Sequence, residues 1–98
     1  MPDVWIDYPL NGATVSSPFT ARGGCSPSNC TVVITLDCGT GANPFPALVD
    51  PQGNWSARVS TTASPGTECT LCAEATDPVT GEKKKVCITI TIGSSQGQ

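Results

Sequence analysis

Histidine is absent from this 98-residue chain, and aromatic residues make up only 5% of it. Without histidine the chain lacks the commonest general base, which excludes Ser-His-Asp triads and zinc sites that use histidine ligands. Serine and threonine are frequent, but no activating partner lies at a motif spacing from them. Gly39-Thr40-Gly41 lacks the lysine and the following helix of a phosphate loop. The sequence therefore predicts a protein that is not an enzyme and that holds no cofactor.

Basic residues are also scarce, with five Lys and Arg against eight Asp and Glu and a net charge of −3. Nucleic-acid binding needs a basic surface, so we expect no nucleic-acid partner. No segment approaches the roughly 20 apolar residues of a membrane span, which predicts no membrane insertion. The N-terminus has neither the basic region nor the apolar run of a signal peptide. We interpret the chain as a complete product that acts outside the cell; the alternative is a module cut from a longer secreted protein.

The six cysteines are the feature most at odds with a cytoplasmic destination. With 38% apolar residues the interior will be thin, and domains of this size are often marginal without cross-links. Three disulfides would each contribute roughly 2–4 kcal/mol, and they persist in oxidising surroundings. An extracellular or virion-surface location follows from this interpretation.

Alternating apolar and polar residues are clearest over positions 68–92, on both sides of the turn formers 77–81. If the two runs form an antiparallel hairpin, one register places Glu74 opposite Lys85 and Cys72 opposite Cys87. The same register puts Leu71 beside Ile88 on an apolar face. A slip of one residue would destroy all of these pairs, because it moves every side chain to the opposite face. The pattern predicts this hairpin and a cross-strand Cys72–Cys87 disulfide.

The rest of the chain contains short extended segments and no helical period. Strands are predicted over 4–8, 13–15, 17–22, 31–37, 45–50 and 55–59, with loops over 23–30 and 38–44. Seven or eight short strands at intervals of roughly 8–12 residues are typical of a β-sandwich. We therefore predict an all-β domain over residues 1–93, followed by a polar tail over 94–98.

Four runs resemble a bacterial immunoglobulin-like domain. They are IDYPLNGATVSSPFTARG, VVITLDCG, GNWSARV and AEATDPVTG. With the segments between them, the resemblance covers about nine-tenths of the chain. The resemblance implies an immunoglobulin-like two-sheet sandwich of seven to eight short antiparallel strands. It implies no catalytic residues, because such domains serve as spacers, adhesion modules and virion decorations alike. The cysteines depart from the general pattern of these domains.

The resemblance also narrows the cysteine pairing. In such a sandwich the third strand lies antiparallel to the sixth, which would place Cys38 opposite Cys69. With Cys72–Cys87 taken from the hairpin, the remaining pair is Cys25–Cys30, closing its own loop. The alternative is a zinc site built from Cys69, Cys72, Cys25 and Cys30. We favour disulfides and no metal, since Cys69 and Cys72 should point to opposite faces of one strand.

Two sets of residues are candidates for binding. Trp5 alternates with buried-type residues and should be exposed, which makes it the best interface candidate, with Tyr8 beside it; Trp55 is expected in the core. Oxygen ligands for calcium are a second possibility, but we interpret them as turn formers that satisfy backbone groups. That set comprises Asp37, Asp50, Asn54 and Asp77.

The leading functional hypothesis is structural: a decoration or cement protein on the virion of a tailed bacteriophage, binding a capsid protein. The first alternative is an adhesion or spacer module of a secreted bacterial surface protein, whose partner would be another protein of the virion or cell surface. The second alternative is a carbohydrate-binding module that recognises glycans through Trp5 and Tyr8.

Overall fold

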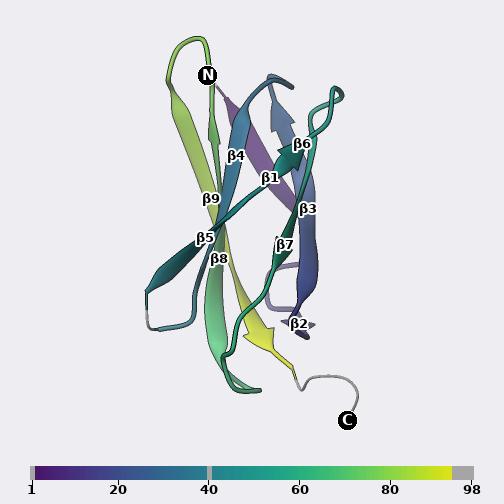
Figure 1. Ribbon diagram of the computed structural model, residues 1–98, viewed down its shortest axis with the longest axis vertical. Helices are drawn as coiled ribbons and strands as arrows, with labels where there is room; N and C mark the ends of the chain where they lie inside the picture. The colour runs from purple at the N-terminus through teal and green to yellow at the C-terminus, as the bar shows by residue number, and fades with distance from the viewer. Residues whose placement is uncertain (1, 40, 94–98) are drawn as a thin grey trace.

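The computed structural model describes residues 2–39 and 41–93, and within them it contains strands and no helix (Figure 1). The predicted polar tail, 94–98, lies outside the described residues. Nine strands follow one another along the chain: β1 (Asp3–Tyr8), β2 (Thr14–Val15), β3 (Phe19–Ser26), β4 (Thr31–Asp37), β5 (Ala42–Pro46), β6 (Leu48–Val49), β7 (Asn54–Val59), β8 (Glu68–Thr76) and β9 (Lys83–Ile92).

The strands form two sheets packed face to face. One has the order β1-β3-β7-β6 and the other β2-β9-β8-β4-β5, in a molecule of 45 × 23 × 19 Å (Figure 1). This confirms the predicted all-β two-sheet sandwich. The count exceeds eight because the single strand predicted over 45–50 is two strands, β5 and β6, which belong to different sheets. The predicted loop 38–44 is correspondingly shorter, since β5 begins at Ala42. One pair also departs from the antiparallel expectation, since β2 runs parallel to β9.

The β8–β9 hairpin adopts the register predicted from the alternation. Glu74 pairs with Lys85, Cys72 with Cys87 and Leu71 with Ile88. In the turn, the Asp77 carboxylate accepts a hydrogen bond from the backbone N–H of Val79 at 2.8 Å. The apolar face of the hairpin then contributes to the core, which also contains Ile34, Leu36, Trp55 and Val59.

Two disulfides join strand β8 to both of its neighbours. Cys72–Cys87 links it to β9, and Cys38–Cys69 links it to the end of β4, both in the predicted pairing. The second bridge extends a register in which Leu36 faces Leu71. Both bridges lie in the five-stranded sheet, so three consecutive strands of that sheet are covalently connected. Neither bridge includes a cysteine of the four-stranded sheet.

The third predicted bridge, Cys25–Cys30, is not formed; both residues are free and buried thiols. The prediction treated 23–30 as one loop, whereas β3 continues to Ser26 and pairs Cys25 with Val4 of β1. Only a short turn separates the two cysteines, where the Cys30 N–H donates to the Pro27 carbonyl at 3.1 Å. Burial raises the pKa of both thiols above the ordinary value.

This burial predicts that Cys25 and Cys30 are unreactive in the folded protein, because the thiolate is the reactive form. Iodoacetamide in native buffer should add no mass over the time that labels an exposed cysteine fully. In guanidinium without reductant it should add two carbamidomethyl groups. An intact mass lower by six hydrogens than the fully reduced chain would contradict this, since it would mean that a third bridge exists.

Candidate functional site

The outer face of the four-stranded sheet carries the exposed aromatic residues of β1. Trp5 is 46% exposed and Tyr8 is 41% exposed. Across the sheet, Trp5 pairs with Gly24 of β3, and Gly24 pairs with Asn54 of β7. These three residues form one row of outward-facing positions across the sheet. A second row of outward-facing positions lies about two residues further along the strands. Its members are Tyr8, Arg22, Ser56 and Leu48.

Two consecutive glycines make room for two tryptophans on opposite faces of this sheet. A Cβ on Gly24 would occupy the space of the Trp5 indole, on the outer face. A Cβ on Gly23 would meet the Trp55 indole on the inner face and overlap the Trp5 carbonyl oxygen. Trp55 is fully buried as predicted, and its Nε1–H donates to the carbonyl oxygens of Trp5 at 3.1 Å and Gly24 at 3.2 Å.

Tyr8 reaches the outer face because of a bulge in β1. A regular alternation with Val4 and Ile6 would place Tyr8 on the inner face, but the Tyr8 side chain is 41% exposed. Ile6 pairs with Gly23 and Tyr8 with Arg22, so Asp7 is an extra residue that reverses the parity after it. The guanidinium carbon of Arg22 then lies 5.5 Å from the centroid of the Tyr8 ring, within the range of a cation–π contact.

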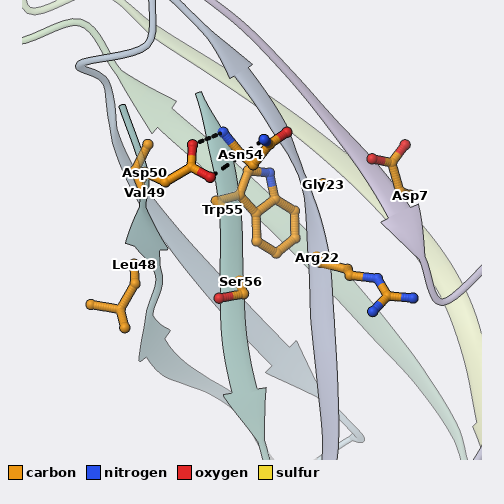
Figure 2. Close-up of a pocket in the computed structure, with 9 residues that line it drawn as sticks. All are labelled: Asp7, Arg22, Gly23, Leu48, Val49, Asp50, Asn54, Trp55 and Ser56. Atoms are coloured by element: carbon orange, nitrogen blue, oxygen red, sulfur yellow. Dashed lines mark hydrogen bonds between the residues drawn. The ribbon is translucent and has the colours of Figure 1, made fainter. Parts of the chain in front are cut away.

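A hollow of about 410 Å³ lies on this face; we call it the outer-face hollow (Figure 2). Arg22 and Asp7 stand on one side of it and Leu48 and Asp50 on the other. The lining is completed by Gly23, Val49, Asn54, Trp55 and Ser56. Arg22, Asn54 and Ser56 point outward through the two-residue alternation of β3 and β7, whereas Asp7 belongs to the bulge of β1 and Asp50 follows β6.

The Asp50 carboxylate is held in place by its own turn. Its Oδ1 accepts hydrogen bonds from the backbone N–H groups of Gln52 and Asn54, each at 2.9 Å. Its Oδ2 accepts a longer bond, 3.4 Å, from the Asn54 side-chain amide (Figure 2). The backbone hydrogen bond from Asn54 is the largest of the effects that lower the pKa of Asp50. The group therefore stays an ionised acceptor at neutral pH.

The other candidate ligands are not brought together. Asp37, Asp50 and Asp77 each accept a hydrogen bond from a backbone N–H group of their own turn. The three turns are separate, so the carboxylates do not form one site. Cys69 and Cys72 belong to different disulfides and offer no thiolate to zinc. Within residues 2–39 and 41–93 there is no group of three acidic, cysteine or histidine side chains placed to bind a metal. Over the same ranges no helix could cross a membrane.

Two solved structures have the same fold as this chain. A crystal structure of an engineered protein superposes with a TM-score of 0.76 at 23% identity, covering 96% of this chain and 20% of that one. A double mutant of a Cellulomonas fimi endo-β-1,4-mannanase gives a TM-score of 0.67 at 22% identity, covering 92% and 18%. No family model and no curated protein matches the sequence.

These similarities concern the sandwich architecture alone. The chain spans about a fifth of the length of each of the two structures. In both of them, a unit with this architecture is therefore one part of a much longer polypeptide. Identity below a quarter carries over no site residue, so Trp5, Arg22 and Asp50 have to be judged from their own geometry.

Proposed function

We propose that this protein is a non-enzymatic, immunoglobulin-like structural module that works as a cross-linked spacer in a secreted or surface-exposed bacterial protein. The observation that carries the proposal is the covalent connection of β4, β8 and β9 by two disulfides. A sandwich with so few aromatic side chains has little core to resist unfolding. Its cross-links protect the sheet that holds most of the long strands.

The comparisons support a spacer over a free-standing protein. The part of each longer chain that matches this fold is about one fifth of its length, as expected of a module that separates or positions other parts. The elongated shape, 45 Å along its longest axis, suits a unit that sets a distance between its neighbours.

Force spectroscopy on the chain held by its two termini tests the spacer role. The oxidised protein should unfold in one cooperative event, because its two sheets share a single core. The bridges span 31 and 15 residues. Reduction should therefore lengthen the unfolded chain by roughly 150 Å, at about 3.3 Å per residue. Gradual extension of the oxidised protein without a force peak would contradict the spacer role.

A phage decoration protein is the second candidate, and the same cross-linking supports it, because virion surfaces face oxidising surroundings without repair. The test is co-sedimentation with purified capsids of tailed phages at physiological salt. Saturable binding, at a stoichiometry set by the capsid lattice, is the result expected of a decoration protein. Failure to sediment with any capsid leaves the spacer module as the proposal.

A further inference from the structure

We propose that the outer-face hollow, together with Trp5, is a binding site for neutral glycans. The inference goes beyond the spacer role and does not depend on it, since a spacer needs no ligand. It rests on three features of one face: an exposed indole, a hollow next to it that is lined by both apolar and polar side chains, and an excess of negative charge that disfavours an anionic ligand.

The Trp5 indole is fixed against the sheet instead of projecting freely into solvent. It fills the space above Gly24, where any other residue would place a Cβ. Even so, Trp5 remains 46% exposed, so part of its aromatic surface is open to a ligand. An indole that is held in position loses little conformational entropy on binding. Sugar rings present C–H groups that can pack on an indole. Aromatic and apolar side chains line most small-molecule sites in the same way.

The hollow supplies the polar part of the site beside this ring. Trp5 covers Gly24 of β3, and Gly24 pairs with Asn54 of the neighbouring strand β7. Asn54 lines the hollow, so the hollow begins one strand away from the position that the indole covers. Asp50 is an acceptor already oriented by its turn, Ser56 offers a hydroxyl, and the Arg22 guanidinium is a donor. A polyhydroxylated ring can donate to the carboxylate and accept from the guanidinium at once.

The charges on the lining select a neutral ligand. Asp7 lies on the same side of the hollow as Arg22, and Asp50 faces them from the other side, which leaves an excess of one negative charge (Figure 2). An anionic polymer would be repelled by the two carboxylates. A protein partner would have to desolvate three charged side chains, which is costly unless each finds an exact counterpart. Hydroxyl groups satisfy such side chains by hydrogen bonds without bringing a charge. A volume of about 410 Å³ falls in the range of small-molecule sites.

The test follows the two tryptophans of the chain by NMR during titration with neutral hexasaccharides of glucose, mannose, xylose and N-acetylglucosamine. At least one of them should shift the Trp5 indole N–H together with the backbone amides of Gly24 and Asn54. The signal of buried Trp55 should hardly move. Trp5→Ala should weaken binding about tenfold, and Asn54→Ala several-fold, as read from the Gly24 amide.

Val79→Ala is the matched control, because Val79 is an exposed apolar residue, 83% exposed, in the β8–β9 turn. It should bind the same hexasaccharide as the unchanged protein does. An unshifted Trp55 indole signal in each variant shows that the sandwich is folded. The proposal is overturned if no hexasaccharide shifts Trp5 at about 10 mM. It is also overturned if only charged polysaccharides bind, or if Trp5→Ala and Val79→Ala bind equally well.

Discussion

Reduction of the two disulfides is expected to remove most of the folding stability of this protein. In the chain-entropy description, closing a 31-residue loop stabilises by about 3–4 kcal/mol and a 15-residue loop by about 3 kcal/mol. Whole domains are stable by only about 5–15 kcal/mol. A thin core with one large buried indole places this protein at the lower end of that range. We therefore expect the reduced chain to be largely unfolded at 37 °C.

Guanidinium unfolding followed by tryptophan fluorescence measures this effect, since Trp55 leaves the core on unfolding. The double variant Cys38→Ala/Cys69→Ala should lose more free energy of unfolding than Cys72→Ala/Cys87→Ala, because it opens the longer loop. Reductant added to a variant that lacks all four of these cysteines is the control, and it should change nothing. Unaltered unfolding midpoints after full reduction of the natural chain would refute the role given to the bridges.

Gly23→Ala is expected to be the most damaging single substitution in the four-stranded sheet. The added methyl would overlap the carbonyl oxygen of Trp5, a backbone atom of the neighbouring strand. That oxygen also accepts a hydrogen bond from Trp55, so it cannot move without disturbing the core. Because neither the methyl group nor the carbonyl can move aside, we expect the free energy of unfolding to fall by about 3 kcal/mol or more.

Gly24→Ala is the matched control for this prediction. The two glycines are adjacent, lie in the same strand and gain the same methyl group. At position 24 the methyl meets the indole of Trp5 and takes the space in which the ring rests, so that it displaces this half-exposed ring into solvent and not into other protein atoms. We expect a loss of about 1 kcal/mol or less in chemical denaturation, with weaker glycan binding because the indole is displaced. Equal losses for the two variants would contradict the assignment of Gly23 to a fixed backbone contact.

The hairpin shows how much of this fold could be predicted from local patterns. Its register follows from alternation alone, because a slip would expose Leu71 and Ile88 while separating Cys72 from Cys87. The Cys38–Cys69 bridge needed one further input, the strand order implied by the family resemblance. Trp55 was placed in the core by its alternation with Ala57 and Val59, and all three are buried.

Only part of the candidate site could be predicted from local patterns. Trp5 could be predicted as exposed, because it alternates with Val4. The hollow beside it could not, since its lining comes from β1, β3, β6 and β7, whose order is a tertiary property. The alternation within their strands indicates weakly that Arg22 and Ser56 face outward. No local sequence pattern predicts that these two residues lie opposite each other.

The sequence by itself determined the strand alternation, the hairpin register and the pairing of the cysteines within it, because these depend on side-chain parity along neighbouring segments. Tertiary structure alone decided that Gly23 and Gly24 lie inside a strand and not in a loop. Glycines favour loops unless another chain segment needs the space of the missing Cβ, and here two indoles from β1 and β7 need it. The pairing of β1 with β3 likewise decided that Tyr8 faces outward, because the register shifts by one residue at Asp7.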